Sequence, residues 1–271
     1  QLMMITIYTI TGSAVYAAEI PVSDQDQLIT SRDWTEISNL QDEMKKEEPD
    51  ATIDYDKALK VYVDCNLIKL QTADTKKLTS ALESANYVWV IPFKMEKTYG
   101  MFTVAKGLPL SEEAKSVLTK AEQEEVKNHA GKWMITETAE HTVEPYYDIL
   151  LEKREALSDC TRVVLVGSQP GMRQPVALGM DDETARIWIS LGYQYPVMEK
   201  IPETQNVESG VYSFDSVAEI SDTYIEDSEV STGAGVQSRS SMKYVAGIGI
   251  IVIGSILILS VLKKKKLEDY E

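Results

Sequence analysis

The sequence predicts an α+β fold, a mostly antiparallel sheet in a single ectodomain with helices covering one face, plus one C-terminal transmembrane helix. Apolar residues recur at helical spacing in some segments and alternate in others, so both kinds of element are present. These elements do not alternate strictly as in a parallel sheet, and adjacent β-rich segments indicate hairpins. An uncharged stretch near the C-terminus is long enough to cross a bilayer.

Apolar periodicity predicts helices over residues 33–48, 73–85, 111–128 and 145–157. Asp33 and Glu36 form a capping-box pattern at the start of the first helix. Ser111 is the expected N-cap of the third helix, and Pro145 suits the first turn of the fourth.

β-Rich runs predict strands over residues 58–64, 87–93, 101–106, 132–138, 162–167 and two more within 176–190. In the first run Leu59, Val61 and Val63 alternate onto one face, which is typical of a half-buried strand. The run at 162–167 is continuously apolar, as expected of a strand buried on both faces. The last two strands form a hairpin that turns at Asp181–Asp182.

The C-terminal apolar segment is interpreted as a membrane span. From Tyr244 to Leu262 there are 19 residues without a charge, enough for a helix of roughly 28 Å. A block of lysines follows at once, comprising Lys263, Lys264, Lys265 and Lys266. By the positive-inside rule this block lies in the cytoplasm. We therefore predict a transmembrane helix over residues 243–262, lipid contact over 244–262, and a basic cytoplasmic tail over 263–271.

The N-terminal segment carries the pattern of a signal peptide. Residues 1–17 are uncharged, and Val15 and Ala17 suit the −3 and −1 positions for cleavage after Ala17. We interpret residues 1–17 as an N-terminally truncated signal peptide, with an uncleaved signal anchor as the alternative. Residues 18–200 then form an extracellular domain of a single-pass type I membrane protein.

Residues 201–242 are predicted to be an acidic, Ser/Thr-rich stalk, because residues 201–238 contain eight acidic residues and no Lys or Arg. The whole chain carries a formal net charge of −16. Such a charge repels phosphate and excludes nucleic acid as a partner. Solubility is the simplest reading of the charge, and attraction of a basic partner is the alternative.

The chain contains two cysteines, Cys65 and Cys160, both in the predicted extracellular domain. That compartment permits a disulfide between them. The chain-entropy model assigns such a bridge, closing about 95 residues, roughly 4–5 kcal/mol. Two separate buried thiols are the alternative.

Two polar motifs resemble sites of chemistry. In "VVLVGSQPG" Gly167 and Ser168 follow a strand, but the spacing of a hydrolase nucleophile elbow is missing, which favours an ordinary loop. Glu137, His141 and Glu144 would share one face of a helix and could ligate a metal, but the segment follows a strand, which favours a solvated loop. The sequence also lacks a P-loop, HExxH or dinucleotide fingerprint, so we predict no catalytic, cofactor-binding or metal-binding residues.

Tryptophans Trp89, Trp133 and Trp188 each fall within an expected strand. Exposed aromatic residues stack on sugars or form protein interfaces, whereas tryptophan in strands is more often part of a core. Core packing is favoured, and a surface for an extracellular protein or glycan remains the alternative.

The order of signal peptide, acidic domain, stalk, span and lysine cap resembles surface proteins of Gram-positive bacteria. The resemblance is one of layout alone, and of the L-P-x-T-G wall-anchoring motif only Thr232 and Gly233 are present. It implies a membrane-anchored extracellular binding or scaffold domain, non-enzymatic and of unknown ligand. The alternatives are a cell-surface hydrolase and an accessory subunit of a membrane complex, which would dock through the Gly247 and Gly254 face of the span.

Overall fold

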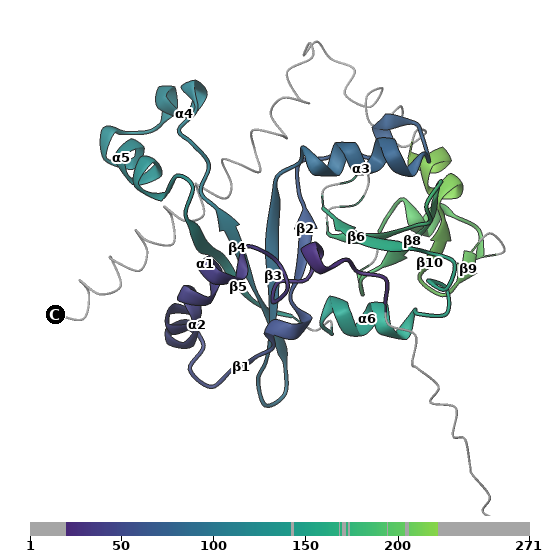
Figure 1. Cartoon of the computed structure of the whole chain (residues 1–271), viewed down its shortest axis with the longest axis horizontal. Helices are drawn as coiled ribbons and strands as arrows, with labels where there is room; N and C mark the ends of the chain where they lie inside the picture. Colours follow the sequence, from purple (N-terminus) through teal and green to yellow (C-terminus); the bar gives the residue numbers. More distant parts are fainter. Residues whose placement is uncertain are drawn as a thin grey trace, which may run out of the picture.

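The computed structural model describes residues 20–141, 144–167, 169, 172, 174–193, 195–203 and 206–221. The strands join one sheet in the order β5-β4-β3-β2-β6-β7-β8-β10-β9, and β1 also pairs with β3 (Figure 1). Their bounds are β1 Thr52–Ile53, β2 Leu59–Tyr62, β3 Tyr87–Lys94, β4 Tyr99–Lys106, β5 Trp133–His141, β6 Arg162–Val166, β7 Val176–Met180, β8 Ala185–Ser190, β9 Asn206–Glu208 and β10 Val211–Ser213. The α+β class with a mostly antiparallel sheet is confirmed.

One parallel pairing, of β2 with β6, divides the sheet into an N-terminal half (β1 to β5) and a C-terminal half (β6 to β10). It pairs Val61 with Leu165 and Tyr62 with Val166. The N-terminal segment reinforces the junction, since it bridges β6 through Val22 and β2 through Gln27. Because so little main chain joins the halves here, side chains on both faces of β2 and β6 must stabilise the junction.

The helices lie on both faces of the sheet. They are α1 Trp34–Ile37, α2 Gln41–Glu47, α3 Thr75–Glu83, α4 Glu112–Val117, α5 Lys120–His129 and α6 Tyr146–Glu152. Figure 1 shows α3 on one side of the C-terminal half-sheet and α6 on the other. The prediction that helices cover one face is therefore wrong. The reason is that β6 and β7 bury almost every side chain, so both of their faces need cover.

Three apolar clusters form the core. On one face Leu78 and Leu82 of α3 pack against β6, β7 and β8. On the opposite face Leu150 of α6 packs against the same strands and β2. The third cluster places Ile37 and Met44, of α1 and α2, against β3 and β4. Each fully buried aliphatic side chain contributes roughly 1.5–3 kcal/mol.

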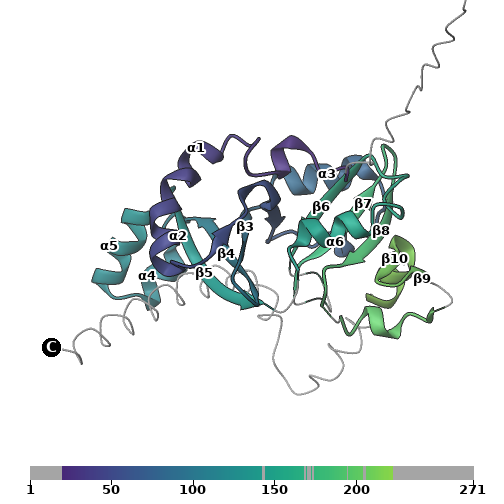
Figure 2. The ribbon, with the colours of Figure 1, turned by 90° about the horizontal axis from the view of Figure 1, so that it is seen from below.

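The charged segment expected as one helix over residues 111–128 is two helices. Ser111 caps α4 as predicted, accepting a hydrogen bond from the Ala114 amide. The first helix ends before Leu118, whose backbone is extended, and Thr119 forms a capping box with Glu122 at the start of α5. Figure 2 shows this pair at the end of the molecule opposite β9 and β10.

The folded domain reaches further along the chain than composition indicates. Strand β10 pairs with β8, residues 214–221 are helical, and Val211, Phe214 and Val217 are buried. The acidic stalk expected from residue 201 therefore does not begin there. Acidic composition suggested a stalk because Asp215 and Glu219 are exposed, but the apolar residues Val211, Phe214 and Val217 recur every three positions and are buried.

Among the residues that the structure describes, no helix is long and apolar enough to cross a membrane. The predicted signal peptide (1–17), the span (243–262) with Gly247 and Gly254, and the tail with Lys263–Lys266 lie outside the described residues.

Candidate functional site

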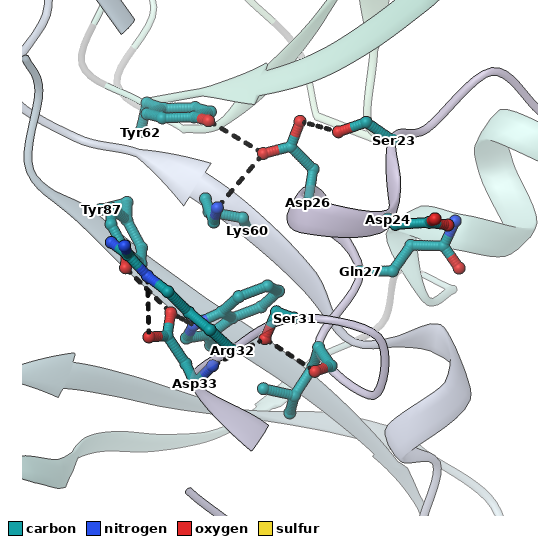
Figure 3. A network of polar contacts seen from close by, with 12 residues as sticks. Ser23, Asp24, Asp26, Gln27, Ser31, Arg32, Asp33, Lys60, Tyr62 and Tyr87 are labelled. Atoms are coloured by element: carbon teal, nitrogen blue, oxygen red, sulfur yellow. Dashed lines mark hydrogen bonds and ion pairs between the residues drawn. The ribbon is translucent and has the colours of Figure 1, made fainter. Parts of the chain in front are cut away.

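The junction between β2 and β6 carries buried charged side chains on one face. Alternation along β2 places Leu59 and Val61 in the core beside α6, which turns Lys60 and Tyr62 to the opposite face. Arg162 of β6 lies on that same face, and the N-terminal segment crosses it. Figure 3 shows the resulting polar network.

Asp26 is the centre of this network. It ends the short 3-10 helix η1 (Asp24–Asp26) and is 2% exposed. Its carboxylate accepts hydrogen bonds from Ser23 Oγ at 2.6 Å, Tyr62 Oη at 2.8 Å and Arg162 Nη2 at 3.0 Å, and lies 3.4 Å from Lys60 Nζ. Burial raises the pKa of Asp26, but the Ser23 hydrogen bond and the two cations outweigh it and hold the pKa below its ordinary value.

Lys60 is held among aromatic rings. Its Nζ lies 4.6 Å from the ring centre of Tyr87, 5.3 Å from that of Trp89 and 5.7 Å from that of Tyr62. The residue is only 8% exposed. Burial lowers the pKa of Lys60, although the neighbouring Asp26 carboxylate opposes the shift.

A second buried carboxylate, Asp33, orients two of these aromatic residues. It accepts hydrogen bonds from Tyr87 Oη at 2.8 Å and Trp89 Nε1 at 3.1 Å. Arg32 lies 3.9 Å from it with an 88% exposed side chain. Asp33 occupies the N-cap position of α1 as predicted, but the capping box with Glu36 is not formed, because the Asp33 side chain makes no cap hydrogen bond. The Asp33 carboxylate accepts hydrogen bonds from β3 and not from the first turn of α1.

A pocket of about 410 Å³ opens beside this network. It lies between the N-terminal segment, the end of α3 and strands β2, β3 and β6. The lining residues are Asp24, Gln25, Thr30, Ser31, Arg32, Asp33, Lys60, Tyr62, Leu82, Glu83, Ala85, Tyr87 and Arg162. Its size lies within the range of small-ligand sites, which combine apolar walls with a few convergent polar groups.

Some hydrogen-bond donors of this network have no acceptor at ordinary hydrogen-bond distance. Arg162 Nε is buried and has no acceptor among the described residues. Lys60 has three N–H donors, and its closest carboxylate oxygen, at 3.4 Å, lies beyond ordinary hydrogen-bond length. Burial, more than the Asp26 charge, raises the pKa of Tyr62, so that its hydroxyl stays protonated and keeps donating to Asp26. The arrangement is therefore suited to binding an acceptor.

Sequence reasoning missed Asp26, Lys60 and Arg162. A usable signal existed only for Lys60, a charged residue within the apolar run "ALKVYV". Asp26 and Arg162 are separated by 136 positions, and no local pattern links them.

The two motifs weighed from the sequence do not form a site in the described structure. Ser168 lies outside the described residues, but its neighbour Gln169 is 3% exposed and donates from Nε2 to the Cys65 and Gly167 carbonyls. His141 ends β5, and no group of three or more His, Cys, Asp or Glu residues in the described structure could hold a metal.

The three strand tryptophans are core residues. Trp89 and Trp188 are fully buried and Trp133 is 7% exposed. They pack in different parts of the sheet, with Trp89 and Trp133 in the N-terminal half and Trp188 against Phe214. They therefore form no aromatic surface for a glycan or protein.

The structure does not bring Cys65 and Cys160 together, and both are free thiols. Cys65 packs against the cluster on the α3 face of the sheet, whereas Cys160 lies in the cluster on the α6 face. Burial raises the pKa of Cys65 to about 12 and that of Cys160 to about 11, so both remain thiols.

Comparison with family models, curated proteins and solved structures finds no match to this chain.

Proposed function

We propose that this chain is a membrane-tethered extracellular binding domain that takes up a small polar ligand in the pocket at the β2–β6 junction. The observation that carries the proposal is the pocket itself, lined by the buried Lys60 of β2 and Asp33 of the N-terminal segment together with the partly exposed Arg162 of β6.

The energetics of the junction support a binding role. Removing Asp26 and Lys60 from water costs several kcal/mol per ion before their mutual attraction is counted. Apolar residues of similar volume often hold such a position as well or better. Buried charges beside an open pocket are therefore better explained by recognition than by stability.

The binding proposal is tested by closing the mouth of the pocket. Thr30 is exposed at the mouth, so Thr30→Trp narrows the entrance without disturbing the apolar core. Ligands found by screening a library of small polar molecules with saturation-transfer NMR should lose binding in this variant. Thr35→Trp is the matched control, since Thr35 is exposed on α1 and does not line the pocket. Equal binding by both variants would contradict the proposal.

The membrane tether is the second part of the proposal. It rests on the uncharged segment 244–262 and the lysines that follow it. Protease added to intact cells should digest the folded domain and leave an epitope after Lys266 protected. Protection of the domain would reverse the orientation and remove the extracellular assignment.

A further inference from the structure

We infer that the junction pocket selects a small organic carboxylate, which binds at Arg162 and Lys60 with its hydrogen-bond donors directed to Asp24 and Glu83. This inference rests on the proposed function and names the ligand class of the same site.

The first support is the donor inventory at the inner wall. Buried N–H groups in folded proteins nearly always have an acceptor. Arg162 Nε has none among the described residues, and Lys60 Nζ, which also contacts three aromatic rings, has the Asp26 carboxylate at 3.4 Å. Both residues line the pocket, so their side chains form part of the wall that meets a ligand.

The second support is the local charge. Asp26 is one negative charge shared by two cations, the buried Lys60 and the partly exposed Arg162. The other buried carboxylate, Asp33, is engaged by Tyr87, Trp89 and the rim residue Arg32. The inner wall therefore keeps one positive charge in excess, within a chain of net charge −16. A monoanion supplies the missing charge, and a neutral ligand does not.

Geometry favours a carboxylate among monoanions. A guanidinium presents donors in a planar fork that matches the two oxygens of a carboxylate. Arg162 already donates to the Asp26 carboxylate through Nη2, so its Nε is proposed to bind one oxygen of the ligand carboxylate while Lys60 binds the other. The rings of Tyr62 and Tyr87 beside Lys60 provide apolar contact for the carbon atoms that bear the carboxylate.

The mouth of the pocket carries negative charge, in contrast to the positive inner wall. Asp24 and Glu83 are exposed, and no ion pair engages either side chain among the described residues. Their carboxylates accept hydrogen bonds from ammonium or hydroxyl groups. The ligand is therefore a carboxylate at one end and a donor at the other, a description that fits an amino acid, a short peptide or an acidic sugar.

The experiment uses the full chain in mild detergent and two matched ligand pairs, measured by isothermal titration calorimetry. Glucuronate is compared with glucose, and alanyl-alanine with alanyl-alaninamide. At least one acid should bind about tenfold or more tightly than its partner. Glu83→Gln should weaken alanyl-alanine and spare glucuronate, because an ammonium loses a charge pair and a hydroxyl keeps an acceptor.

Arg162→Lys tests the guanidinium directly. It should weaken the bound acid about tenfold, while Arg154→Lys, at an exposed position after α6, should leave the affinity unchanged. If Arg162→Lys destabilises the fold, the comparison of each acid with its neutral partner on the wild-type protein still tests the inference.

Two results overturn the inference and are distinguishable. If neutral ligands bind as tightly as acids at a site that Thr30→Trp blocks, the carboxylate inference fails and the binding function stands. If no ligand is sensitive to Thr30→Trp, the proposed function itself fails.

Discussion

The two faces of the β2–β6 junction hold the same two half-sheets together, one through apolar packing and the other through ion pairs. On the α6 face Leu59, Val61 and Leu165 are about 1% exposed and pack as a dry apolar layer. On the other face Lys60 and Arg162 converge on Asp26 beside an open pocket. Both faces join two half-sheets whose main chains share a short parallel pairing.

The difference separates a stabilising face from a recognition face. The apolar layer gains free energy from burial at any pH and needs no partner. The charged face depends on a balance between one carboxylate and two cations, which makes it sensitive to pH and to ligand. The losses of unfolding free energy caused by substitutions on the two faces should therefore differ in size and in pH dependence.

The largest effect is expected for Asp26→Asn. This change leaves the buried Lys60 and the partly exposed Arg162 without a counter-charge, and breaking a buried ion pair costs about 3–5 kcal/mol of unfolding free energy. Urea denaturation at pH 7 measures the loss. A loss below about 1 kcal/mol, the range of exposed ion pairs, would show that solvent reaches the cluster freely.

The pH dependence of this loss follows from the lowered pKa of Asp26. The folded pKa lies below the unfolded value of about 3.9, so the carboxylate stabilises the fold above that pH. Its contribution is lost as the pH falls through the folded pKa. The difference between wild type and Asp26→Asn should therefore shrink in acid.

The second effect is the matched substitution on the apolar face. Leu165→Ala removes a side chain that is 1% exposed and should cost about 2–5 kcal/mol. Because no charge is involved, the difference from wild type should stay constant between pH 7 and acid. A pH-dependent difference would contradict the statement that the apolar face stabilises the fold independently of the charged face.

A smaller effect is expected for Tyr62→Phe. The change removes the hydroxyl that donates to Asp26 at 2.8 Å and keeps the buried ring. Hydrogen bonds to charged groups contribute roughly 1.5–3 kcal/mol, and thermal or urea denaturation should show a loss of that size. Because a hydrogen bond donated to the ionised carboxylate is stronger than one to its protonated form, the loss should be smaller in acid. A loss that does not change with pH would show that the charge of Asp26 does not strengthen this hydrogen bond.

The smallest effect on stability is expected for Lys60→Met. The methionine keeps the apolar stem, and Asp26 keeps Ser23, Tyr62 and Arg162 as partners. Removing the excess buried charge offsets the lost ion pair, so the unfolding free energy should change by less than about 1 kcal/mol. The variant should nevertheless bind carboxylates less tightly. A large loss of stability with unchanged binding would make Lys60 a structural residue.

Much of the fold could be predicted from local patterns. The hairpins of β3 with β4 and of β7 with β8 are confirmed at the expected places. The buried character of β6 is confirmed as well. Periodicity predicts these elements because it records which side of a segment meets the core. It failed for residues 206–221, where the acidic composition outweighed a short apolar repeat in the prediction.

The candidate site could not be predicted in the same way. Asp33 illustrates the reason, since its sequence context is that of a helix N-cap and its contacts are with Tyr87 and Trp89 of β3. A short polar side chain serves either role equally well, and only the position of a distant strand decides between them.

The sequence by itself determined most of the elements before residue 200, although not the division of residues 111–128 into two helices, and the alternation that places Lys60 and Leu59 on opposite faces of β2. It also contains the uncharged segment on which the proposed membrane tether rests. Only the tertiary structure decided that β2 pairs in parallel with β6, which brings Arg162 within 3.0 Å of Asp26. The physical reason is that periodicity reports the burial of each residue separately. The meeting of distant charges depends on sheet order and register, which no short stretch of sequence contains.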